Sequence, residues 1–187
     1  KELTYVNGAS SDDGAQISTE VLEKLASMRR GSVTIRYKLG GEIKDSDSKI
    51  TLFYVSGSEQ DSNASFYIKP SNGMIGYEVR NQQTVVNADS AALADIKNTD
   101  WHTITYTFEP DKTKIYLDSV LVLENRNGGF LKSVKDVQSA QIALAPFSGE
   151  INELCVTYDV LDAAEVEGIH AATTGNKLEL PESAKKT

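Results

Sequence analysis

The chain has 187 residues, the length of one domain with a single hydrophobic core. Its 27 Asp and Glu outnumber its 19 Lys and Arg, and the net charge of −8 argues against nucleic acids and anionic membranes as partners. Hydrophobic residues make up 40%, and no apolar run approaches the roughly 20 residues of a membrane helix, so the composition predicts a folded globular domain.

The only cysteine is Cys155, which excludes an intrachain disulfide and a cysteine-rich zinc site. We expect its thiol to be buried as a small hydrophobic group. The sequence opens with KELTYV and shows neither a basic start nor an apolar leader. We expect that a targeting segment has been removed and that the protein is extracellular, either secreted or attached to a cell surface.

The N-terminal part of the chain carries a helical pattern. Apolar side chains recur at spacings of three and four at Ile17, Val21, Leu25 and Met28. This spacing makes one face of a helix apolar, so it predicts a helix from about Thr19 to Met28 that packs on the rest of the domain.

The middle of the chain consists of short segments in which β-branched and aromatic residues alternate with polar ones. They predict about nine or ten strands, among them Ser32–Lys38, Lys49–Ser56, Ala64–Lys69, Met74–Arg80, Trp101–Glu109, Lys114–Asp118, Val120–Glu124, Val137–Ala145 and Glu150–Val160. Turn residues separate these segments and no helical pattern lies between them. We therefore predict an all-β, antiparallel sandwich of the jelly-roll type with short flanking helices. The segment 49–56 is apolar enough to be buried on both faces.

A second helix is predicted after the last strand. Asp162 can cap its first turn while Glu165, three residues later, completes a variant of the capping box. The helix should end near Ala172. Residues 173–187 are polar and contain one proline, so we expect a domain over residues 1–172 and a linker or tail over 173–187.

The sequence offers little for catalysis. Its two histidines, His102 and His170, cannot form a His-rich metal site, and no nucleophile elbow or phosphate-binding glycine motif is present. Glu150 and Glu153 are three positions apart, which places them on opposite faces of one strand unless a bulge intervenes. We predict a protein that is not an enzyme and has no cofactor or metal. The Asp45-Ser46-Asp47 loop is a solvated turn or, alternatively, a calcium site.

The segment MIGYEVR carries the most suggestive pattern for ligand binding. Gly76, Glu78 and Arg80 share one face of the predicted strand, while Tyr77 and Val79 point to the other. An acid and a base about 6 to 7 Å apart then lie beside a glycine gap. A guanidinium can hold a carboxylate, and a carboxylate can accept hydrogen bonds from sugar hydroxyl or amide groups. The alternative is a solvated ion pair on the outside of a sheet.

Three stretches carry a resemblance to a known family. The first is Ile17–Leu39, with a helix and a V-x-[IM]-x-[FY]-K strand, and the second is Gly73–Arg80, with an E-x-R strand. The third is Asp100–Asp118, followed by Gly129–Leu131, Val137–Ala145 and Gly149–Ile169. Together they resemble the family 40 carbohydrate-binding modules, the lectin-like, concanavalin-A-like sandwiches that accompany bacterial sialidases. The resemblance implies binding of terminal sialic acid on glycans such as mucin, with an attached sialidase catalytic domain as a covalent partner. It also implies that Arg80 holds the carboxylate and Glu78 contacts hydroxyl or N-acetyl groups.

One loop departs from that family. The family commonly has a longer loop with a second arginine and an aromatic residue, whereas residues 146–149 read PFSG. Arg126, Tyr67 and Phe147 are weaker candidates for the rim of the site. A second hypothesis is therefore that the chain is a concanavalin-A-like domain of a bacterial surface adhesin that binds glycan or protein without sialic acid specificity.

Overall fold

The computed structural model describes residues 3–4, 15–16, 19–40, 49–59, 62–69, 73–82, 84–92, 100–126, 134, 136–142 and 149–174. Within these residues the chain forms twelve strands and two helices. In chain order they are β1 (Leu3–Thr4), β2 (Ala15–Gln16), α1 (Thr19–Ser27), β3 (Gly31–Leu39), β4 (Ile50–Ser56), β5 (Asn63–Lys69), β6 (Met74–Asn81), β7 (Thr84–Ala92), β8 (Trp101–Glu109), β9 (Lys112–Leu117), β10 (Val120–Asn125), β11 (Ser139–Ile142), β12 (Gly149–Thr157) and α2 (Ala163–Thr174).

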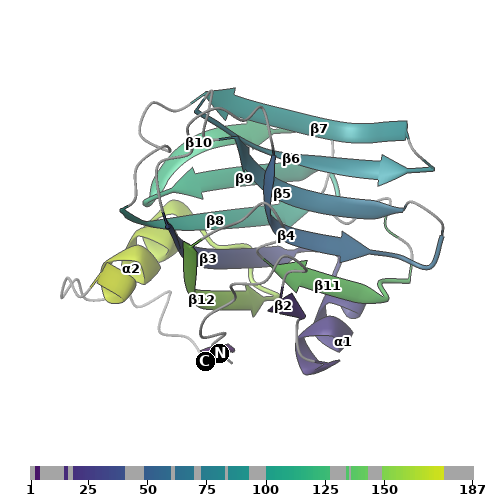
Figure 1. Ribbon diagram of the computed structural model, residues 1–187, viewed down its shortest axis with the longest axis horizontal. Coiled ribbons are helices and arrows are strands. Elements are labelled where there is room, and N and C mark those ends of the chain that lie inside the picture. The colour runs from purple at the N-terminus through teal and green to yellow at the C-terminus, as the bar shows by residue number, and fades with distance from the viewer. Residues whose placement is uncertain are drawn as a thin grey trace.

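The strands form two six-stranded sheets (Figure 1). Sheet A has the order β1-β12-β3-β8-β9-β10, and sheet B has the order β2-β11-β4-β5-β6-β7. Every pair of neighbouring strands is antiparallel. This arrangement confirms the predicted antiparallel β-sandwich with two short helices.

The core lies between the two sheets. It is built from every second residue along the strands, whose side chains face the opposite sheet. Phe66 of β5 and Tyr106 of β8 stack across the interface with ring centroids 3.5 Å apart, and Phe53 of β4 packs beside Phe66. Burial of these large side chains removes apolar area from water on both sheets at once, which makes it the main stabilising contribution to the sandwich. Cys155 is buried, as the sequence predicted.

The two helices cover different parts of the sandwich (Figure 1). Val21, Leu25 and Met28 of the first helical segment join the main core. α2 packs against the outer face of sheet A, where Val166 forms a small cluster with Tyr116 of β9. The predicted capping box is present, because the Asp162 amide donates to Glu165 and the Glu165 amide donates to Asp162. None of the helices in the described part of the chain is long and apolar enough to cross a membrane.

Several details of the elements differ from the sequence predictions, among them α1, which ends at Ser27, and β12, which ends at Thr157. Strand β7, and the two-residue strands β1 and β2, were not predicted, and α2 ends at Thr174 rather than near Ala172. Strand β4 is not buried on both faces. Thr51, Tyr54 and Ser56 point outward and are only half-buried, and the strand is interrupted by a bulge between Thr51 and Phe53.

Candidate ligand-binding site on the outer face of sheet B

The alternation predicted for β6 is present in the structure. Tyr77 and Val79 are buried in the core, whereas Glu78 and Arg80 lie on the outer face of sheet B. On the neighbouring strand β5, Ser65 lies opposite Glu78, and Tyr67 lies opposite Gly76. The glycine adds no side chain beside this aromatic ring, and both residues are buried.

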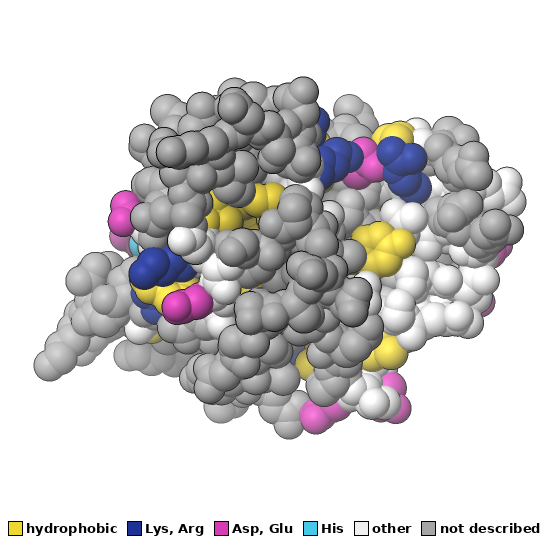
Figure 2. All heavy atoms as spheres, in the orientation of Figure 1, with side chains coloured by type: hydrophobic (Ala, Val, Ile, Leu, Met, Phe, Trp, Pro, Cys, Tyr) yellow, Lys and Arg dark blue, Asp and Glu magenta, His cyan; other side chains and the backbone are white. Residues whose placement is uncertain are grey.

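Glu78 lies between two cations. Its Oε2 accepts a hydrogen bond from Lys49 Nζ at 2.7 Å, and its Oε1 accepts one from Arg80 Nε. The side chain of Glu78 is 14% exposed, against 36% for Lys49 and 39% for Arg80. The carboxylate is thus the deepest member of a Lys49–Glu78–Arg80 cluster whose formal charge is +1. Figure 2 shows basic and acidic side chains side by side on this face of the molecule, over the upper strands of sheet B.

Lys49 reaches the cluster from a distant part of the sequence. It immediately precedes β4, and its side chain extends across β5 so that Nζ lies 4.5 Å from the centroid of the Tyr67 ring. A cation above an aromatic face is attracted by the ring quadrupole. Tyr67 itself is only 7% exposed, so its ring forms the floor of the site rather than a freely exposed stacking surface.

The charges of the cluster determine the protonation state of Glu78. Burial of the carboxyl acts to raise its pKa, but the hydrogen bonds and positive charges of Lys49 and Arg80 outweigh this effect, and the pKa of Glu78 is lowered. Glu78 is therefore ionised at neutral pH and acts only as a hydrogen-bond acceptor. The cluster can hold an anionic group at its cations and accept hydroxyl or N–H groups at its carboxylate.

Of the other two predicted rim residues, the structure describes only Arg126, which forms a separate ion pair. Arg126 follows β10 of sheet A, is 80% exposed, and donates from Nε to Glu124 Oε1 at 3.0 Å. Phe147 lies outside the described residues, as does Pro146. Of the predicted set, the structure therefore places Glu78, Arg80 and Tyr67 in one site, and it adds Lys49, which the sequence reasoning missed.

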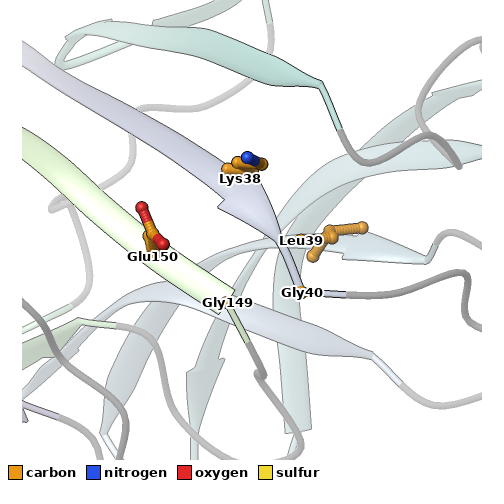
Figure 3. Close-up of a pocket in the computed structure, with 5 residues that line it drawn as sticks. All are labelled: Lys38, Leu39, Gly40, Gly149 and Glu150. Atoms are coloured by element: carbon orange, nitrogen blue, oxygen red, sulfur yellow. The ribbon is translucent and has the colours of Figure 1, made fainter.

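A separate hollow of about 400 Å³ lies at one end of sheet A (Figure 3). It is lined by Lys38, Leu39, Gly40, Gly149 and Glu150. The exception stated for positions 150 and 153 applies, because β12 contains a bulge between Ile151 and Glu153, with position 150 opposite Lys38 and position 153 opposite Arg36. Figure 3 shows the side chains of Lys38 and Glu150 on the same side of their strands. A base, rather than a second acid, thus faces Glu150 across the strands.

His102 takes part in a hydrogen-bond arrangement with Asp118 at the end of β9. Its Nδ1 is 2.6 Å from Asp118 Oδ2, and the Thr103 amide donates to Asp118 Oδ1 at 2.9 Å. In the part of the chain that the structure describes, no three His, Cys, Asp or Glu side chains gather as a metal site would require. The Asp45-Ser46-Asp47 loop lies outside that part.

Comparison with known proteins identifies relatives of this fold. The family model described as "Sialidase, N-terminal domain" matches residues 4–153. The solved CBM40 domain of the Ruminococcus gnavus IT-sialidase superposes with a TM-score of 0.69 at 19% identity, covering 91% of this chain and 97% of that one. The same module bound to α2,6 sialyllactose gives 0.70 at 16% identity, covering 89% and 98%. No curated protein matches the chain in sequence.

A larger protein contains a similar domain. The leech intramolecular trans-sialidase, complexed with 2,7-anhydro-Neu5Ac, superposes with a TM-score of 0.67 at 18% identity. The match covers 88% of this chain and 27% of the leech protein. At these identities the structural matches establish the fold of the sandwich.

Proposed function

The chain belongs to the family of sialidase N-terminal domains, the family 40 carbohydrate-binding modules, and we propose that it is a non-catalytic module that binds terminal sialic acid. The observation that carries this proposal is the outward-facing pair of Glu78 and Arg80 on β6, set beside Gly76 and the Tyr67 ring. Two structures of the similar R. gnavus module, bound to α2,3 and α2,6 sialyllactose, support sialic acid as the ligand.

Each group in the pair matches one part of a sialic acid. The guanidinium of Arg80 carries donors that suit the sugar's carboxylate. Glu78 is ionised, because its two cationic neighbours lower its pKa, and it accepts hydrogen bonds from hydroxyl groups or from the N-acetyl N–H. Tyr67 provides an apolar floor beneath the cations.

The partners and location follow from this ligand. Sialylated glycans such as mucins lie outside cells, so the module is extracellular, either secreted or attached to a bacterial cell surface. It targets an attached sialidase catalytic domain to such glycans. The leech enzyme, of which the chain spans 27% of the length, supports this arrangement because it combines a similar domain with a much longer chain.

The proposal is tested by titrating the chain with α2,3- and α2,6-sialyllactose, with lactose as the control, by calorimetry or NMR. We expect binding that depends on sialic acid and is lost in Arg80→Ala and in Glu78→Ala while the thermal melting temperature changes little. Intact binding in both variants would contradict the proposed site.

Arg126→Ala provides a matched comparison, because Glu124 and Arg126 form the same Glu-x-Arg ion pair on sheet A. We expect Arg126→Ala to bind as the wild type does. Loss of binding in this variant would mean that Arg126 contributes to the binding site.

A second function is favoured by one sequence feature. Residues 146–149 contain no arginine that could contribute to a carboxylate site. A glycan- or protein-binding domain of a surface adhesin, without sialic acid specificity, fits this feature as well. It predicts no difference between sialyllactose and lactose in the titration.

A further inference from the structure

Lys49 occupies a position in the site that no sequence motif marks. Its Nζ is 2.7 Å from Glu78 Oε2, while Arg80 bonds the other oxygen of the same carboxylate. We propose that Lys49 is the second cation of the binding site, and that its ammonium joins the Arg80 guanidinium in holding the carboxylate of the bound sugar. This inference rests on the proposed function.

The order of burial in the cluster favours an anionic ligand. Glu78, at 14% exposure, lies below Lys49 and Arg80, at 36% and 39%. A ligand that approaches from solvent therefore meets two cations before it meets the carboxylate. The cluster carries a formal charge of +1 on a protein of net charge −8, so the attraction for an anion is local to this site.

The ammonium of Lys49 is held in place before any ligand binds. It is fixed on one side by the hydrogen bond to Glu78 and from below by the Tyr67 ring, whose centroid is 4.5 Å away. A lysine side chain normally loses much rotamer freedom on binding, and a side chain that is already positioned loses less. Lys49 can therefore contribute to affinity more than a freely mobile surface lysine.

A purely structural role for Lys49 makes a different prediction. If Lys49 served only to neutralise Glu78, its removal would weaken every ligand to a similar degree. If it holds the ligand's carboxylate, its removal should affect only ligands that carry this charge. The comparison of sialyllactose with its methyl ester, in which the carboxylate is neutral, separates the two roles.

The test measures dissociation constants of α2,3-sialyllactose and its methyl ester for the wild type and for Lys49→Met, which keeps an unbranched apolar stem over Tyr67. We expect the wild type to prefer the free acid by about tenfold or more, since charge-assisted hydrogen bonds are the strong ones. In Lys49→Met this preference should fall to about twofold, through weaker binding of the acid. Lys49→Arg should restore most of it.

Lys112→Met is the matched control. Lys112 forms an ion pair of 3.1 Å with Glu109 on sheet A and is 35% exposed, close to the values for Lys49. The Lys112→Met variant should prefer the free acid over the methyl ester as strongly as the wild type does. If Lys49→Met keeps the wild-type preference for the free acid over the methyl ester, the proposed role of Lys49 is overturned but the proposed function is not. If the wild type binds sialyllactose and lactose equally, the proposed function is overturned and this inference with it.

A measurement on the wild type does not depend on the folding of any variant. NMR signals of the Lys49 side chain, observed at Cε and Hε, should shift during titration with sialyllactose and shift much less with the methyl ester. Equal shifts with both ligands would contradict the contact between Lys49 and the carboxylate.

Discussion

Asp118 fixes the β9–β10 hairpin to strand β8. Asp118 and Ser119 form the two-residue turn of the hairpin with φ values of 48° and 72°, in the left-handed region that Asp and Asn tolerate better than most residues. One carboxylate oxygen bonds His102 and the other accepts the Thr103 amide. Burial acts to raise the pKa of Asp118, but these hydrogen bonds and the charges of His102 and His170 lower it.

Asp118→Asn isolates the contribution of this charge, because asparagine tolerates the same backbone conformation. We expect the free energy of unfolding at neutral pH to fall by about 1–2 kcal/mol through loss of the charge-assisted bonds. A lowered carboxyl pKa in the folded state stabilises the protein above the ordinary pKa of about 4, and this stabilisation is lost as the pH falls through the folded value. Urea unfolding at several pH values should show the difference between wild type and variant shrinking below about pH 4. A difference that stays constant with pH would contradict this account.

The site residues differ in how far the sequence could predict them. Glu78 and Arg80 could be assigned to one outward face because a strand alternates with period two, and the structure has them there. Lys49 could not be assigned to the same site. Its approach to Glu78 depends on the register of β4 against β5, which contains a bulge, and on the register of β5 against β6.

Arg126 illustrates the converse limit of sequence reasoning. Glu124 and Arg126 repeat the Glu-x-Arg spacing of the site, and they form the same kind of ion pair. Glu124 lies on β10 of sheet A and Arg126 directly follows that strand, however, while Glu78 and Arg80 belong to sheet B. A local motif predicts which residues share a face of a strand, but only the sheet order decides what lies beside that face.

At the level of elements, Ser32 links strand β3 to the segment that leads into α2. Its hydroxyl is fully buried, donates to the Asp159 carbonyl at 2.7 Å and accepts the Leu161 amide at 3.0 Å. This single side chain satisfies two backbone groups at the point where the chain leaves β12. It thereby fixes the path by which α2 reaches the outer face of sheet A.

Ser32→Ala should destabilise the domain markedly. The substitution leaves a carbonyl and an amide without their partner, and we expect a loss of about 2–3 kcal/mol in the free energy of unfolding. Ser27→Ala is the control, because the Ser27 hydroxyl bonds the Lys24 carbonyl and the Tyr158 hydroxyl at an exposed position. It should change stability by less than about 0.5 kcal/mol. Similar losses in the two variants, measured by chemical unfolding, would mean that the buried position of Ser32 is not decisive.

The strands that the sequence predicted well are those with strong alternation. β8 runs over Trp101–Glu109, the predicted bounds, because β-branched and aromatic residues occupy most of its positions. β7 was missed because its sequence, TVVNADSAA, is rich in residues that are uncommon in strands. Its strand conformation comes from pairing with β6 along its whole length. The two-residue strands β1 and β2 likewise exist through pairing with β12 and β11.

At the level of the whole molecule, the site is one small cluster on the outer face of an acidic sandwich. The net charge of the protein, −8, repels an anionic sugar over long range, so the attraction depends on the two cations beside Glu78. A few charge-assisted hydrogen bonds on an open surface correspond to a dissociation constant on the order of 10 µM to 1 mM. One copy of the module should therefore hold a glycan only briefly.

Weak binding at a single open site favours ligands that present many sialic acids. Two copies joined by a flexible linker should bind sialyllactose with the affinity of one copy, because each sugar fills one site. On a mucin surface, the second copy binds at the high effective concentration that the linker sets, and we expect retention to rise by about 10²–10⁴-fold. Surface plasmon resonance on immobilised mucin measures this difference.

A tandem protein with Arg80→Ala in one copy should return to the retention of a single module, since only the second intact site can supply the gain. If the tandem with two intact copies shows no gain, the density of sialic acids on the surface, rather than the strength of the single site, limits the attachment.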